Sequence, residues 1–172
     1  MTGKILTIAI VVCALFAGGA MYYLQVYGYY YDVPEAEYQV VLTSVVTEEP
    51  EVIDTYDFTA IDADSSPIRY RACFKTDSSI AMLTETYKIY DKPEPLLAPK
   101  WFECFDAKTI GEDLETGAAV AFMGTRNQTY GIDRIVAIYP DGRGYVWHEV
   151  NECGDKNYDG SPVDPSCPKG DK

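Results

Sequence analysis

IDRIVAIYPDGRGYVWHEV, residues 132–150, predicts a β-hairpin. Pro140, Asp141 and Gly142 separate two apolar runs that are rich in β-branched and aromatic residues. A turn sequence between two such runs is typical of antiparallel strands joined by a tight turn. Because other strand patterns precede this one, we expect an α+β domain. It would contain an antiparallel sheet of about five to seven strands and one or two short helices.

Three further segments have the residue pattern of strands. YQVVLTSVVT (38–47) is apolar and β-branched on nearly both faces, which predicts a buried strand before a turn at 48–50. IRYRACFK (68–75) alternates between apolar and mostly polar residues, which predicts a half-buried strand. AAVAFMG (118–124) predicts another buried strand.

Two segments contain helix signals. Residues 106–117 have an aspartate suited to an N-cap, two apolar residues one turn apart and a terminal glycine, so we expect a short helix. Residues 78–90 are ambiguous, because a serine cap and helical spacing in the first half give way to strand-like alternation in the second. Residues 91–99 contain three prolines, which predicts a loop.

A long uncharged segment precedes the domain. Residues 5–31 contain no charged side chain over 27 positions, and about 20 apolar residues suffice to cross a bilayer. Cleavage of a signal peptide after Ala20 is the alternative, because small residues precede that position. Retention is favoured because the apolar run continues into an aromatic cluster suited to the membrane–water interface. The cluster consists of Tyr22, Tyr23, Tyr27, Tyr29, Tyr30 and Tyr31.

The charges around this segment predict its orientation. Lys4 is the only charged side chain before it, whereas acidic residues follow it directly. The positive-inside bias therefore predicts a single-pass protein of a bacterial inner membrane, with a cytoplasmic N-terminus and a periplasmic C-terminal domain. We divide the chain into an anchor helix (1–31), a linker (32–37), an α+β domain (38–152) and a polar tail (153–172).

Small residues recur along the anchor at helical spacing. Ala9, Cys13 and Ala17 are four residues apart, and Ala14 and Gly18 form a second pair with the same spacing. Small residues at this spacing let another helix approach closely in lipid, so we expect this stripe to pack on a membrane partner.

The cysteine pattern predicts two disulfides. Apart from Cys13, the four cysteines lie in the exported part, and Cys73–Cys104 with Cys153–Cys167 would close local loops and leave no odd thiol. Disulfides suit an oxidising compartment such as the periplasm. Four unpaired buried thiols are the alternative. A zinc site is disfavoured because there is no CxxC pair and only one histidine.

The chain is strongly acidic beyond the anchor. After Tyr31 there are 27 acidic and 13 basic side chains, which gives a net charge of −14. This charge argues against a nucleic-acid partner. It would attract basic proteins or cations, although charge of this kind also serves solubility alone.

We find no complete catalytic motif in the sequence and expect no enzyme activity. The chain has no GxSxG motif and no glycine-rich phosphate loop. His148 is the only histidine, and we expect a structural or a surface role because catalysis needs partner groups. Asp62 and Asp64 precede a Ser-Ser-Pro sequence, which is typical of a turn rather than of an acid–base pair.

The tail contains a partial calcium-loop pattern. Asp155, Asn157, Asp159 and Gly160 occupy the first key positions of such a loop, where alternate oxygen ligands can surround a hard cation. The usual glutamate is replaced by Ser166, although Asp164 is a possible substitute ligand. An ordinary turn in a polar tail is the alternative.

Several stretches resemble those of an uncharacterised family of short envelope proteins from alphaproteobacteria. They are AMYYLQVY, IDADSSPIRYRACF, MLTETY, WFECFDA and YGIDRIVA, and the similarity extends over nearly the whole chain. The resemblance implies an anchored envelope protein. Some members are labelled histidine kinase, but this chain is too short for a kinase and lacks the nucleotide-binding motifs.

Two functional classes remain. The first is a non-enzymatic accessory or assembly subunit of an inner-membrane complex, with a respiratory complex as the expected kind because basic c-type cytochromes work in the periplasm. The second is a periplasmic module that senses calcium or a small ligand. An enzyme whose site cannot be recognised in the sequence is a less favoured third. A convergent polar pocket would favour the second or third class, and copurification would favour the first.

Overall fold

The computed structural model describes residues 2–37, 39–154, 157–158, 160 and 167. The N-terminal elements are α1 (Thr2–Tyr23), a π-helical turn η1 (Leu24–Gly28), β1 (Tyr30–Asp32) and a 3-10 turn η2 (Glu35–Glu37). The remaining elements are β2 (Val40–Thr43), β3 (Pro50–Ile53), β4 (Tyr56–Ala63), β5 (Arg71–Lys75), α2 (Ile80–Thr86), α3 (Ala107–Thr116), β6 (Val120–Thr129), β7 (Ile132–Ile138) and β8 (Arg143–Val150).

A six-stranded antiparallel sheet in the order β1-β4-β5-β8-β7-β6 is the centre of the domain. The predicted hairpin is confirmed as β7 and β8. Its turn requires glycine at Gly142, where φ is +87° and an added Cβ would lie 2.4 Å from the carbonyl oxygen of Thr76. The α+β class is confirmed, since the antiparallel sheet is accompanied by two short helices, α2 and α3.

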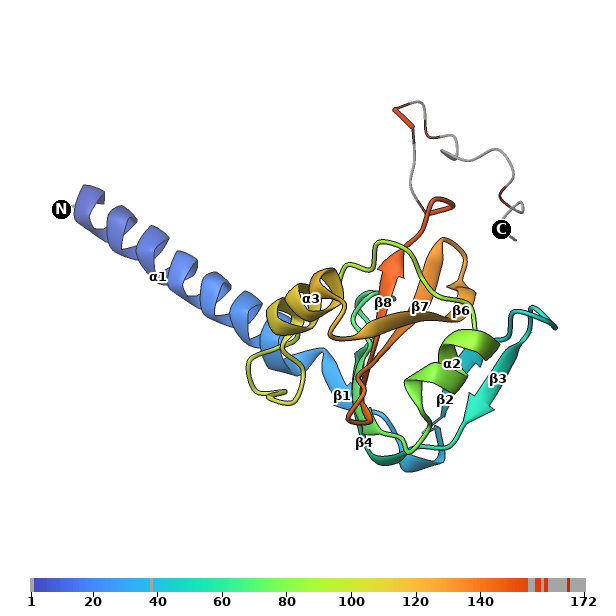
Figure 1. Cartoon of the computed structure of the whole chain (residues 1–172). Coiled ribbons are helices and arrows are strands. Elements are labelled where there is room, and N and C mark those ends of the chain that lie inside the picture. The colour runs from blue at the N-terminus through green and yellow to red at the C-terminus, as the bar shows by residue number, and fades with distance from the viewer. Residues whose placement is uncertain (1, 38, 155–156, 159, 161–166, 168–172) are drawn as a thin grey trace.

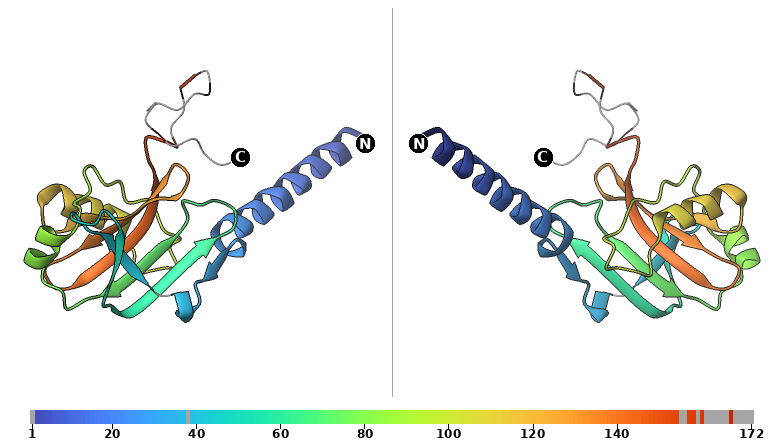
Figure 2. Two further views of the ribbon diagram at one scale, coloured as in Figure 1. Left: turned by 90° about the vertical axis from the view of Figure 1, so that its right-hand side faces the viewer. Right: turned by 90° about the vertical axis from the view of Figure 1, so that its left-hand side faces the viewer.

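Both faces of the sheet are covered (Figures 1 and 2). On one face, the β2–β3 hairpin and α2 enclose a core that contains Leu42, Leu83 and Phe122. On the other, α3 and the loop before it enclose a second core around Trp147 and Ile110. The prediction of a half-buried strand at 68–75 is therefore wrong for β5, where the first four residues are all buried.

The ambiguous segment 78–90 is both a helix and an extended strand-like segment. Ser79 caps α2 by accepting a hydrogen bond from the Met82 amide. The chain then becomes extended, and Tyr87 and Ile89 form isolated bridges with Ser44 and Phe122. The extended half thereby links β6 to the end of β2, which accounts for its strand-like alternation.

The second predicted helix is confirmed as α3. The Asp106 side chain accepts hydrogen bonds from the amides of Lys108 and Thr109, and so satisfies amides that have no partner inside the helix. Gly117 ends the helix with φ of +76°, a left-handed conformation that favours glycine.

One helix in the described part of the chain, Gly3–Gly28, is long and apolar enough to cross a membrane. It projects from one side of the domain as an extended rod (Figure 2). The chain then enters the sheet at once, because β1 pairs with β4 and Val33 is buried in the first core. The edge strand β1 therefore takes up the end of the segment predicted as the anchor (1–31) and the first residue of the predicted linker (32–37).

Both predicted disulfides are present in the structure. Cys73 in β5 bonds to Cys104 in the loop before α3, and Cys153 bonds to Cys167. The first bond fastens that loop to the sheet across 31 residues of sequence. Cys13 is free and exposed on α1.

We expect the replacement of both Cys73 and Cys104 by alanine to lower the free energy of unfolding by about 2–4 kcal/mol, because the unfolded chain regains the entropy of an open loop. Urea unfolding of the full chain in mild detergent measures this loss. Cys13→Ala is the control and leaves the midpoint unchanged. A double variant as stable as the wild type would contradict the prediction.

Candidate functional site

The end of the anchor helix is fastened to the domain by side-chain contacts. The Trp101 indole Nε1 donates a hydrogen bond to the carbonyl oxygen of Val26 at 2.7 Å. Arg69 donates to the carbonyl oxygen of Gln25 at 3.2 Å and also to the Gln25 side chain. The Arg69 guanidinium lies 5.4 Å from the centre of the Tyr30 ring, within cation–π range. We call these five residues the junction.

Aromatic rings extend the junction along the helix. The Trp101 ring lies 6.5 Å from Tyr27 and 5.8 Å from Tyr30, measured between ring centres. Tyr27 in turn lies 6.0 Å from Tyr23 and 6.4 Å from Tyr22. The predicted tyrosine cluster therefore continues into the domain through Trp101, a residue that the sequence did not single out.

A buried arginine holds the loop that carries Trp101. Arg71 is almost fully buried, and its guanidinium donates hydrogen bonds to the carbonyl oxygens of Ile68, Tyr70, Leu96 and Leu97. Burial lowers the pKa of Arg71 to about 10, so the side chain remains charged at neutral pH. Arg71 was expected on the solvent face of a half-buried strand, so this contact could not be predicted from the sequence pattern.

His148 is enclosed and fully hydrogen-bonded. Arg134 Nε donates to His148 Nε2 at 3.0 Å, so the ring proton is on Nδ1, which lies 2.8 Å from the carbonyl oxygen of Pro67. The Tyr70 ring stacks on the imidazole at 4.9 Å. Burial, followed by the charge of Arg134, lowers the pKa of His148 to about 4. The imidazole is therefore neutral at neutral pH and connects three segments of the domain, which fits the expected structural role.

Two carboxyl groups are buried opposite each other on β7 and β8. Asp133 Oδ1 accepts hydrogen bonds from the Asn127 amide at 2.8 Å and the Asn151 side chain at 2.6 Å, whereas Oδ2 has no hydrogen-bond partner in the described part of the chain. Glu149, its cross-strand partner, accepts from Trp147 Nε1 and the Glu94 amide. Burial raises the pKa of Glu149. These contacts fix two loops to the sheet.

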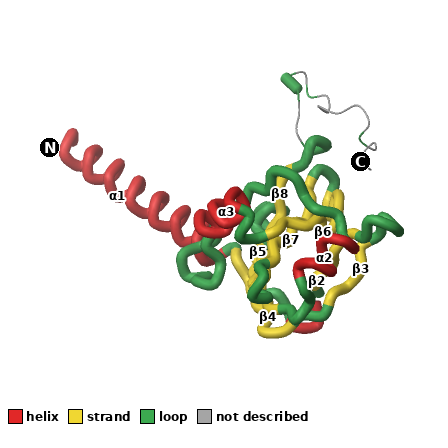
Figure 3. Tube along the Cα trace, viewed as in Figure 1, coloured by secondary structure: helices red, strands yellow, loops and turns green. Residues whose placement is uncertain are grey.

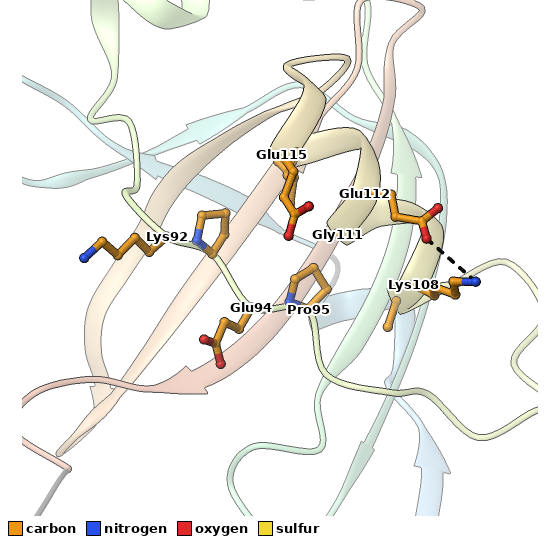
Figure 4. Close-up of a pocket in the computed structure, with 10 residues that line it drawn as sticks. Lys92, Glu94, Pro95, Lys108, Gly111, Glu112 and Glu115 are labelled. Atoms are coloured by element: carbon orange, nitrogen blue, oxygen red, sulfur yellow. Dashed lines mark ion pairs between the residues drawn. The ribbon is translucent and has the colours of Figure 1, made fainter.

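A groove of about 700 Å³ lies between α3 and the loop at 92–95 (Figure 4). Its charges are mixed: Lys92 and Glu94 come from the loop, and α3 contributes an ion pair of Lys108 with Glu112 at 3.7 Å. Glu115 of α3 also lines the groove, so its charged side chains are three glutamates and two lysines. None of the site residues predicted from the sequence lines this groove.

The remaining polar and small residues considered in the sequence analysis do not form a site in the described part of the chain. Asp62 lies in β4 and Asp64 in the turn after it, while the nearby arginines form separate contacts, Arg69 at the junction and Arg71 in the sheet. The stripe of small residues is exposed along α1: Ala9, Cys13, Ala14, Ala17 and Gly18.

The calcium prediction concerns residues that are mostly outside the described part. Asp155, Asp159 and Asp164 are not among the described residues, whereas the carbonyl oxygen of Asn157 accepts a hydrogen bond from the Gly160 amide at 2.9 Å. No group of three His, Cys, Asp or Glu side chains suited to a metal occurs among the residues that were placed. The calcium loop stays a prediction.

Comparison with known proteins identifies a family. The model of a family of unknown function (DUF6446) matches residues 40–168. The chain belongs to this family. The match begins at β2, so it covers most of the domain and leaves α1 and β1 outside. No curated protein and no solved structure matches the chain. The resemblance to an uncharacterised family is confirmed at this level.

We expect the single imidazole of the protein to titrate with a pKa near 4 in an NMR experiment on the full chain. Burial and the adjacent Arg134 disfavour its charged form. A titration near the ordinary value of 6.5 would show that Arg134 and burial do not act on it as the geometry requires.

The same shift predicts a pH dependence of stability. Between pH 4 and 6.5 the unfolded chain binds a proton at His148 that the folded chain does not, so the free energy of unfolding rises with pH. The full contribution, up to about 3 kcal/mol, is present above pH 6.5 and is lost as the pH falls toward 4. In His148→Gln, which keeps an acceptor for Arg134, this part of the slope should vanish. Equal slopes in both proteins would contradict the prediction.

Proposed function

We propose that the protein is a non-enzymatic, single-pass accessory or assembly subunit of a bacterial inner-membrane complex. In this proposal α1 packs against a membrane-embedded partner, and the acidic domain lies on the periplasmic face of that partner. A respiratory complex is the expected kind, because its basic soluble partners, such as c-type cytochromes, would meet the acidic domain there.

The junction is the observation that carries this proposal. An anchor that only tethers a domain can end in a flexible linker, whereas here Trp101 and Arg69 bond to the main chain where the helix ends. Such contacts set the position of the domain relative to the helix. A fixed position is useful when helix and domain must fit one partner together, because less freedom is then lost on binding.

The exposed surface of α1 supports the same proposal. Among the described residues, none of the domain covers the stripe of small residues, which stays open to another helix. An added Cβ at Gly18 or at Gly19 meets no atom within 4 Å. Close packing against this stripe would bring two backbones together and add dispersion contacts over many atoms.

The topology is part of the proposal. The two disulfides suit a domain in the oxidising periplasm, and the lone Lys4 before the helix favours a cytoplasmic N-terminus. The acidic residues after Tyr31 contribute little to orientation, so the positive-inside argument rests on Lys4 and the terminal amine.

We expect the mature protein to keep α1. The intact mass of protein extracted from membranes should correspond to a chain that includes the whole helix. A mature chain that starts at Met21 would remove the anchor, and with it the proposed mode of docking.

We expect Gly18→Leu to lower copurification of the partner complex at least about tenfold, because the added side chain holds the partner backbone away. The measurement is affinity purification of the full-length protein in mild detergent, followed by quantification of stoichiometric partners. Expression and both disulfides should be unchanged, since the domain core does not involve Gly18.

Gly19→Leu is the matched control. It makes the same change one residue further along, about 100° around the helix and nearly opposite Ala17. Partner recovery should be retained in this variant. The proposal fails if wild-type protein purifies alone, or if both glycine variants lose the partner equally.

A further inference from the structure

The length of α1 sets the level of the junction relative to a bilayer. If Lys4 lies at one boundary, about 20 residues at a rise of 1.5 Å each carry the helix across a hydrocarbon core of about 30 Å. The helix then leaves this core near Leu24. Val26 lies two residues further, about 3 Å outside the hydrocarbon and within the headgroup layer of about 5–7 Å on that side.

The domain contributes two side chains at this same level. Trp101 is bonded to Val26 and Arg69 to Gln25, so both are within hydrogen-bond distance of this part of the helix. Tryptophan is enriched at membrane interfaces, and an arginine at this depth can pair with lipid phosphates. Both residues come from loops of the domain and are far from the anchor in sequence.

The loop that carries Trp101 also has the composition of an interfacial segment. It runs beside the end of α1 (Figures 1 and 3) and includes Leu97, which is 80% exposed, and Lys100. Arg71 fixes the carbonyl oxygens of Leu96 and Leu97. A leucine this exposed on a fixed loop is unfavourable in water and favourable at the edge of the hydrocarbon.

We infer that the domain itself contacts the lipid headgroup layer through Trp101, Arg69 and the loop at 96–101. The occupant of this surface is the lipid leaflet from which α1 emerges. Lipid is favoured over a protein partner because Trp101 and Arg69 contact the helix at the level where it leaves the bilayer. The inference depends on the retained anchor of the proposed function, and it adds a contact that the anchor alone does not require.

Fluorescence quenching by brominated lipids tests this inference. The chain has two tryptophans, and Trp147 is fully buried in the second core, whereas Trp101 is 38% exposed. With the full chain in phosphatidylcholine vesicles, bromines near the ester end of the acyl chains should quench most of the Trp101 emission. Bromines near the terminal methyl should quench it less, because the indole lies at the interface.

Trp101→Phe is the control, because it keeps an aromatic ring and leaves Trp147 as the only tryptophan. Its emission should be insensitive to brominated lipid. Flotation of the vesicles shows separately whether the anchor is inserted. Inserted protein whose Trp101 is quenched by aqueous acrylamide but not by lipid bromine overturns the inference and leaves the proposed function standing. Protein that does not float with the vesicles overturns both.

Discussion

Burial of both sheet faces is the constraint on which the other contacts depend. Polar groups on β5, β7 and β8 cannot reach water, so they need partners within the protein. Arg71 donates hydrogen bonds to four carbonyl oxygens, and Glu149 accepts hydrogen bonds from Trp147 and the Glu94 amide. His148 is hydrogen-bonded to Arg134 and to the carbonyl oxygen of Pro67. Most of these partners lie in loops. Hydrogen bonds to the buried polar side chains of the sheet therefore hold the loops in place over it. As a result, this small domain has well-defined surfaces.

The same contacts connect the core to the N-terminal helix. Arg71 holds the carbonyl oxygens of Leu96 and Leu97, the disulfide to Cys104 holds the other end of that loop, and Trp101 between them bonds to Val26. The anchor is thus connected to the centre of the sheet through one loop with attachments on both sides of Trp101. This loop has little regular structure, yet it determines how helix and domain meet. The three prolines at 91–99 lower the conformational entropy of the unfolded chain, so less entropy is lost when this loop is ordered.

Features determined by local sequence could be predicted, and features determined by distant partners could not. Residues close together in sequence determine the hairpin, the capped helix α3 and the apolar anchor. The cysteine pairing followed from loop closure and an even count. The burial of Arg71 depends on a loop that returns to cover β5 about 25 residues later, and alternation alone predicted one solvent face. The junction depends on contacts between residues that are 44 and 75 positions apart, so the tyrosine cluster could be predicted from the sequence but its contact with Trp101 could not.

A domain fastened to the end of its helix cannot reorient independently of it. Transmembrane helices adjust to bilayers of different thickness by tilting. If a flexible linker joined helix and domain, such a tilt would not change the orientation of the domain. With Trp101 and Arg69 bonded to the helix end, a tilt of the helix turns the whole sheet with it. Helices in membranes tilt over a range of about 0–40°. A change of about 10° in the helix, a modest part of this range, becomes the same rotation of the domain. In the proposed topology, the thickness of the surrounding lipid would thereby set which side of the acidic domain faces along the membrane plane.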